Sequence, residues 1–160
     1  MLRRLSLVGL CLVLVPAVAW PVRAGDRRPF KGNCVATWDN VFNGLFMPPA
    51  NFIGQGNVTH LGLAHQQGTM TLEPPIDVQQ VMFPGHGTVT LTAANGDELT
   101  FHFEGVLDVN TGVGDGRFEF VGGTGRFAGA TGGGTFHAVI DLSYPVAQPM
   151  TVVLDGQVSY

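Results

Sequence analysis

Short runs of alternating apolar and polar residues, broken by glycine or proline every few positions, constrain this chain more than any other feature. Asn95-Gly96 lies in the clearest example, with apolar residues at every second position on both sides: Val89, Leu91, Ala93, Leu99, Phe101 and Phe103. Asn-Gly between two such runs predicts a β-hairpin. No stretch after residue 25 has the 3.6-residue apolar period of a helix. The sequence therefore predicts an all-β domain.

The same alternation recurs along the chain and gives seven or eight strands in total. Besides the two hairpin strands, runs of this kind occur at 33–38, 57–63, 68–73, 118–120, 136–142 and 152–160. Many short strands at near-even spacing favour a sandwich or an antiparallel barrel. The chain holds 23 glycines in 160 residues, about twice the usual share, and only 12% charged residues. This composition excludes helical bundles, and the 45% apolar content excludes a disordered chain.

Two proline-containing connections, 47–56 and 73–87, interrupt the strand pattern. They hold or adjoin apolar residues where exposed loops are normally polar: Phe46, Met47, Phe52, Ile53, Ile76, Met82 and Phe83. One interpretation is that both connections fold over the open ends of a barrel as plugs. The other is that they line the mouth of a ligand cavity.

Residues 1–24 have the layout of a secretory signal peptide. Arg3 and Arg4 precede an apolar run over 5–18, and small residues follow up to Ala24. A run of 14 residues is short for a membrane helix, so we expect no transmembrane segment after cleavage and a secreted or periplasmic location. The domain then spans 25–160, with Cys34 as its one cysteine, which we expect to be a buried thiol.

The charge distribution excludes nucleic acid as a partner. Residues 32–160 contain eleven acidic residues but only two basic ones, Arg117 and Arg126. An acidic surface of this kind repels phosphate backbones, and the basic patch that nucleic-acid binding needs is absent.

A glycine-rich segment at 121–134 invites a nucleotide-binding interpretation, which its context excludes. A P-loop needs a lysine after its last glycine, and the chain has no lysine after Lys31. A dinucleotide-binding fold needs a helix and further βαβ units, and a strand pattern follows here instead. We therefore expect no cofactor.

The same segment resembles a known family of barrels. The motif is similar to the Gly-Gly-Ser/Thr-Gly-x-Phe signature of plant allene oxide cyclases and to the matching stretch of dirigent proteins; its residues are Gly122, Gly123, Thr124, Gly125, Phe127, Gly129 and Gly132. Residues 57–62 and 94–97 also resemble small exported bacterial proteins of this type with no settled activity. The resemblance implies a closed or nearly closed eight-stranded antiparallel barrel of calycin type. It transfers no catalytic residue, because the motif contains no acid or base.

In physical terms the motif is structural. Gly122 to Gly125 can adopt positive φ and turn the chain sharply, Phe127 can anchor the turn to the core, and Gly129 and Gly132 can let a strand kink at a barrel corner.

Neither of two candidate metal sites has the required pattern. Residues 108–119 place Asp, Asn and Glu at positions 1, 3 and 12 of a calcium loop, but position 5 lacks a ligand and Val113 occupies the turn glycine position. The five histidines, His60, His65, His86, His102 and His137, show no short ligand spacing. We interpret 108–119 as a hairpin loop and expect no metal.

The candidate catalytic residues are His102, Glu104 and His137. His102 and Glu104 alternate with Phe101 and Phe103 and so share the opposite face of one strand. If the strand that carries His137 were a neighbour, the three could supply acid or base chemistry. The competing interpretation is that the alternation simply places them toward solvent.

Three functions remain open at this point. The first is a noncatalytic module that binds a small apolar ligand or a protein partner, including a second copy of the chain. The second is a cyclase- or dirigent-like protein that shapes a reactive substrate in an apolar cavity, and the third is an outer-membrane barrel. Enzyme activity stays undecided, with the absence of a matched catalytic residue favouring binding. Cavity volume discriminates between the first two, because ligand pockets usually exceed about 300 Å³.

Overall fold

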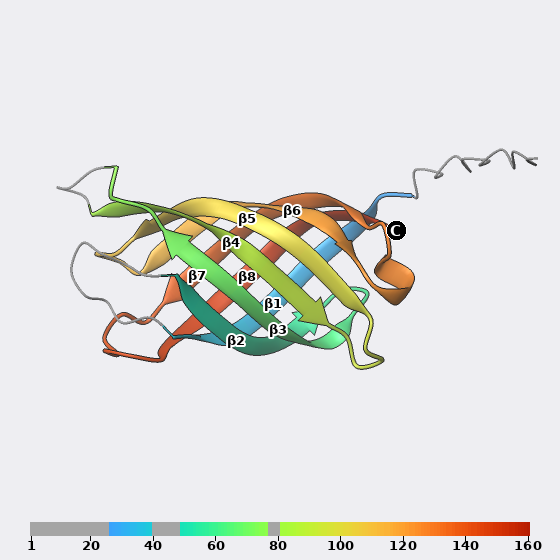
Figure 1. Cartoon of the computed structure of the whole chain (residues 1–160), viewed down its shortest axis with the longest axis horizontal. Helices are drawn as coiled ribbons and strands as arrows, with labels where there is room; N and C mark the ends of the chain where they lie inside the picture. Colours follow the sequence, from blue (N-terminus) through green and yellow to red (C-terminus); the bar gives the residue numbers. More distant parts are fainter. Residues whose placement is uncertain (1–25, 40–48, 77–80) are drawn as a thin grey trace, which may run out of the picture.

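The computed structural model describes residues 26–39, 49–76 and 81–160. Within these ranges eight antiparallel strands pair in chain order, and β8 pairs back onto β1 to close a barrel (Figure 1). The strands are β1 Arg28–Asp39, β2 Ala50–Val58, β3 Gly62–Leu72, β4 Met82–Thr92, β5 Glu98–Asp108, β6 Val113–Gly123, β7 Thr131–Ile140 and β8 Gln148–Ser159. The predicted all-β fold and the eight-stranded barrel are confirmed. The predicted signal peptide lies outside the described residues.

Period-2 alternation places the core inside the barrel. Along β1, Phe30, Cys34 and Trp38 point inward and are fully buried, whereas Lys31 and Asp39 are exposed. The other strands repeat this pattern with apolar residues inside. Each buried apolar side chain contributes about 1.5–3 kcal/mol through removal of its surface from water. The one helix within the described ranges is the single turn η1, Gly125–Phe127, and no helix there is long and apolar enough to cross a membrane.

The hairpin predicted at Asn95-Gly96 joins β4 and β5. Gly96 has φ 86°, which glycine adopts without strain. Asn95 donates from Nδ2 to Oδ2 of Asp97 at 2.9 Å and accepts the Asp97 N–H at 3.2 Å. The turn therefore has its own side-chain hydrogen bonds as well as the strand pairing that it initiates.

Three predicted boundaries are wrong. The strand expected at 57–63 is the end of β2 and the start of β3, joined by a turn at 59–61 in which His60 has φ 70°. The connection expected at 47–56 is largely β2. The second connection, 73–87, likewise gives its last six residues to β4, including Pro84. Proline lacks a backbone donor and so predicts an interruption of a strand, but in both segments the inward-facing Phe52 and Phe83 continue the barrel wall. Phe46 and Met47 lie outside the described residues.

Inward-facing glycines make room for phenylalanine rings inside the barrel. A methyl group on Gly87 would lie 2.7 Å from the Phe103 ring, and one on Gly105 would lie 2.8 Å from the Phe136 ring. The ring of Phe52 covers Gly68 in the same way. Such contacts are too close for any Cβ, so part of the glycine content sets the packing of the lumen in addition to turning the chain.

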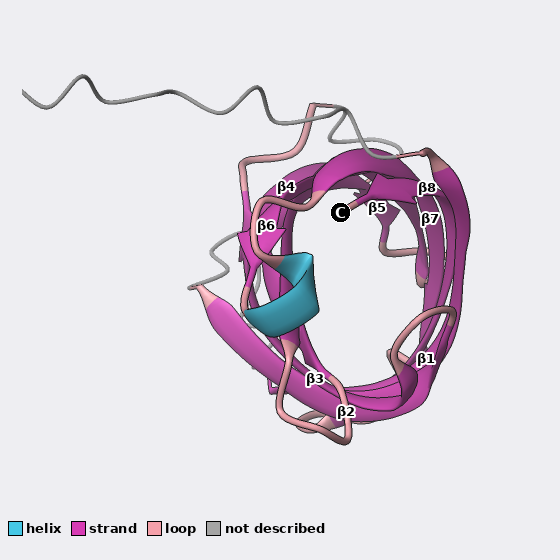
Figure 2. Cartoon of the chain, turned by 90° about the vertical axis from the view of Figure 1, so that its right-hand side faces the viewer, coloured by secondary structure: helices cyan, strands magenta, loops and turns pink. Residues whose placement is uncertain are grey.

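The glycine-rich motif closes one end of the barrel. Gly122, Gly125, Gly129 and Gly132 all have positive φ, between 54° and 120°. Phe127, at the end of η1, is fully buried and its ring packs edge-on against Tyr160, 4.9 Å between centroids. Figure 2, which views the barrel from this end, shows η1 lying at the rim. The motif thus contributes to shape and packing.

Candidate functional site

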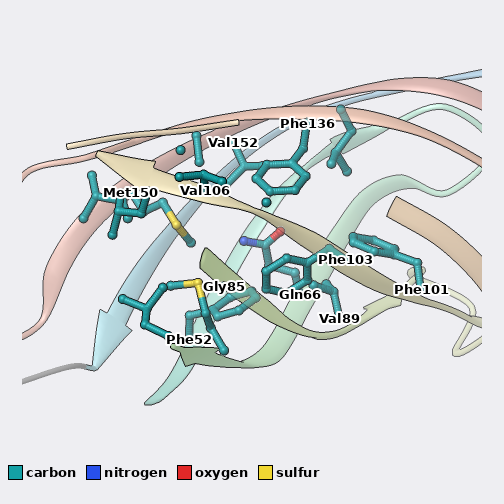
Figure 3. Close-up of a pocket in the computed structure, with 18 residues that line it drawn as sticks. Phe52, Gln66, Gly85, Val89, Phe101, Phe103, Val106, Phe136, Met150 and Val152 are labelled. Carbon is teal, nitrogen blue, oxygen red and sulfur yellow. The ribbon is translucent and has the colours of Figure 1, made fainter. Parts of the chain in front are cut away.

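The opposite end of the lumen contains a cavity of about 70 Å³. It lies toward the end of the barrel where β3 and β7 end and β4 and β8 begin. Residues of seven strands form its walls (Figure 3). Phe52, Met70, Phe103, Phe136 and Met150 form much of the lining. The cavity is therefore a strongly apolar space set inside the barrel wall.

One polar side chain, Gln66, is among the described residues that line this cavity. Gln66 points inward from β3 and is 6% exposed. Figure 3 shows its amide in the middle of the cluster, between Phe103, Phe136 and Met150. Its Nε2 has no hydrogen-bond partner among the described residues. A buried donor without a partner lowers the stability of the folded state by about 1–3 kcal/mol, so this amide destabilises the unliganded barrel.

Gln148 and Trp38 are two further buried residues with an unpaired polar atom. They face each other across β8 and β1, and neither lines the cavity. Gln148 donates from Nε2 to the carbonyl of Tyr144 at 3.1 Å, while its Oε1 and the Nε1 of Trp38 have no partner in the described part of the chain. The amide nitrogen of Gln148 is therefore hydrogen-bonded to the β7–β8 connection, whereas the amide nitrogen of Gln66 is not hydrogen-bonded to any described residue.

The phenylalanine side chains inside the barrel form two groups. Phe101, Phe118 and Phe120 are almost fully buried and stack with Phe30, with centroids 4.9–6.0 Å apart. Phe103 and Phe136, 5.6 Å apart, are partly buried and line the cavity. The cavity therefore lies beside the Phe103–Phe136 pair, and Phe101 of the buried group also lines it.

The candidate catalytic residues His102, Glu104 and His137 do not form a cluster. β6 lies between the strand of His102 and Glu104 and the strand of His137, so the required adjacency is absent. All three are exposed on the outer face. Nδ1 of His102 lies 2.8 Å from Oγ1 of Thr88, and Nδ1 of His137 lies 2.8 Å from Oδ1 of Asp115.

The outer face near His102 and Glu104 is hollowed, with an open volume of about 1010 Å³. Thr88, Arg117 and Glu119 also line this hollow, which adjoins the glycines at 132–134. No group of three or more His, Cys, Asp or Glu side chains with metal-site geometry occurs in the ranges that the structure describes. The hollow is a solvated surface with small, separate side-chain pairs.

Cys34 is the buried free thiol expected from the sequence. Burial raises the pKa of this thiol to about 11, from about 9, because the thiolate would lose its hydration inside the barrel. Cys34 does not line the cavity. It therefore behaves as a small apolar core residue at neutral pH.

A scan against known protein families finds no match, and neither does a search of curated proteins. Among solved structures, the pterocarpan synthase dirigent protein PsPTS1 aligns with a TM-score of 0.53 and 14% sequence identity, covering 86% of this chain and 97% of that chain. The pterocarpan synthase dirigent protein GePTS1 aligns with a TM-score of 0.45 and 14% identity, covering 93% and 97%.

The chain has a dirigent-like fold. The likeness rests on the barrel, since the identity is 14%, and it assigns no substrate to this chain. What the barrel can bind depends on its own cavity.

Sequence reasoning missed Gln66. The residue lies in the polar run His65-Gln66-Gln67, where nothing distinguishes an inward glutamine from two outward neighbours. The signal that could have found it is its position in the strand: Gln66 is two residues from Ala64 and two from Gly68, and every second residue of a strand faces the same side.

Proposed function

We propose that this protein, once exported, binds a small, mainly apolar molecule in the lumen cavity and does not convert it chemically. The observation that carries the proposal is an apolar cavity inside a closed barrel with a single buried polar side chain, Gln66. Concave, mostly apolar sites with few polar groups are typical of small-molecule binding.

The cavity volume limits the size of what binds. At about 70 Å³ it is well below the usual range of ligand pockets and about half the size of a cavity of ~150 Å³ that accommodates benzene. A short alkyl group fits without rearrangement. A ring needs more space than this volume, and the unbranched thioether side chains of Met70 and Met150 in the lining can change rotamer at low cost.

The cavity lining favours binding over catalysis. The structural neighbours are pterocarpan synthase dirigent proteins, which makes substrate shaping the second candidate. Acid or base catalysis needs a titratable group within hydrogen-bond reach of the substrate. The described residues that line the cavity include no Asp, Glu, His, Lys, Arg, Cys or Tyr.

The outer face gives little support to the outer-membrane alternative. Glu104 and Arg117 are exposed midway along β5 and β6, opposite each other on the outside of the barrel. In a membrane barrel these positions would face hydrocarbon, where a basic side chain costs about 2–4 kcal/mol.

Titration of the protein with xenon, followed by NMR of 13C-labelled methionine methyl groups, tests the proposal. Met70 and Met150 line the cavity, and Met82 at the start of β4 does not, so it is an internal reference. We expect saturable shifts at Met70 and Met150 and little change at Met82. Absence of saturable shifts at both cavity methionines would contradict the proposal.

A matched pair of variants on β7 controls for indirect effects. Ala138→Leu adds three carbons inside the cavity, and Thr135→Leu adds bulk on the exposed face of the same strand. We expect xenon shifts to be lost in Ala138→Leu and kept in Thr135→Leu. Equal shifts in both variants would place xenon outside the cavity and overturn the proposal.

A further inference from the structure

The amide of Gln66 is the one feature of the cavity that apolar packing does not explain. Its neighbours across the ladders are Gly54 on β2 and Leu91 on β4, and neither carries a side-chain acceptor. The other side chains that line the cavity within the described ranges are apolar, with only the weakly accepting thioether sulfurs of Met70 and Met150 among them, and none is a hydrogen-bond partner of Nε2. A molecule that enters the cavity would supply the missing acceptor.

The chemistry of the surroundings restricts that acceptor to a neutral group. An anionic ligand would need a cation nearby, because burying an unpaired carboxylate is very costly. Arg117 lies exposed on the outer face. Arg126 lies at the closed end, where it bonds the carbonyl of His60 at 2.7 Å. None of the basic residues that the structure describes lines the cavity, so a ketone, ether or hydroxyl oxygen fits the site and a carboxylate does not.

We propose that Gln66 is the specificity-determining contact of the lumen cavity, donating from Nε2 to the oxygen of a small, neutral, oxygenated and otherwise apolar ligand. This proposal rests on the binding function proposed above and adds the chemical class of the ligand. The apolar walls provide affinity through burial, and the amide distinguishes an oxygenated ligand from a hydrocarbon of the same shape.

A pair of isosteric probes tests the role of Gln66 separately from binding itself. The probes are 2-butanone and 2-methyl-1-butene, which differ in a carbonyl oxygen against a methylene group. Their dissociation constants come from the methyl shifts of Met70 and Met150, in the wild-type protein and in Gln66→Leu. Water solvates the ketone more strongly than the alkene. Comparing the ratio of the two dissociation constants between the two proteins cancels this difference.

We expect Gln66→Leu to weaken ketone binding relative to alkene binding by about tenfold, equivalent to about 1.4 kcal/mol. Gln148→Leu is the matched control, because it removes a second buried glutamine that does not line the cavity. Its ketone-to-alkene ratio should stay within twofold of the wild-type ratio. Butyrate at neutral pH should shift neither cavity methionine.

The possible results separate the two proposals. If Gln66→Leu binds the alkene and its ketone-to-alkene binding ratio equals that of the wild type, the proposed role of Gln66 is wrong and the proposed binding function is still supported. No binding of xenon or of either probe would overturn both. If Gln66→Leu alters the fold, as seen from the Met82 methyl and the strand amide shifts, Gln66→Met is the substitute variant, and the same loss of preference is required of it.

Discussion

Replacing Gln66 by leucine should make the unliganded protein more stable. The substitution removes an amide whose nitrogen is buried without a partner in the described part of the barrel, a penalty of about 1–3 kcal/mol. Leucine also loses about 1 kcal/mol less side-chain conformational entropy on burial than glutamine does. Allowing for imperfect packing of the branched side chain, we expect a net gain of about 2 kcal/mol in the free energy of unfolding. For a domain of this size that gain raises Tm by about 6 °C.

Urea unfolding followed by far-UV circular dichroism measures this effect, with thermal unfolding as a second reading. Gln148→Leu again serves as the control, since it breaks the 3.1 Å hydrogen bond to the Tyr144 carbonyl and should be clearly less stable than Gln66→Leu. A Gln66→Leu protein less stable than wild type by more than about 0.5 kcal/mol would contradict this prediction. That result would mean that the amide is satisfied in the unliganded barrel.

Two further predictions concern the core and the closed end. The pKa of Cys34 is raised to about 11, so the folded protein keeps a thiol proton that the unfolded chain releases near pH 9. The free energy of unfolding should therefore be unaffected by this group below pH 9 and fall by up to about 3 kcal/mol between pH 9 and 11. Urea titrations across this range should show the fall, and Cys34→Ala should remove it; the same fall in Cys34→Ala would contradict the assignment. Phe127→Ala should cost about 3–5 kcal/mol, because the ring is fully buried against Tyr160. Val121→Ala, at an exposed position, should cost less than about 0.5 kcal/mol by the same urea assay, and a Phe127→Ala loss as small would show that the motif does not hold this end closed.

The sequence predicts the barrel well where local signals agree with the tertiary structure. Asn95-Gly96 combines turn chemistry with period-2 alternation on both sides, and the structure places a hairpin there. At Pro84 the local signal and the fold disagree, because proline lacks a donor while the inward position of Phe83 keeps the strand in the wall. Propensity alone cannot decide such a conflict, since burial by other strands outweighs it.

The candidate site could not be read from the sequence, because it depends on register. Gly105 and Phe136 lie on non-adjacent strands, and only the pairing of β5, β6 and β7 brings the ring over the glycine. The separation of His102 from His137 by one intervening strand has the same origin. Parity was available from the sequence, but the order and stagger of the strands were not.

The pairing of β1 with β8 has a consequence for how the chain folds. Arg28 pairs with Val158 and Trp38 with Gln148, so the first strand finds its second partner only in the last one. During synthesis β1 exposes an unpaired edge until nearly the whole chain is available, and that edge is a template for pairing with other chains. Closing so long a loop has an entropic cost that the local hairpins do not share. The seam between β1 and β8 is therefore where we expect folding to be slowest and where misassembly between copies begins.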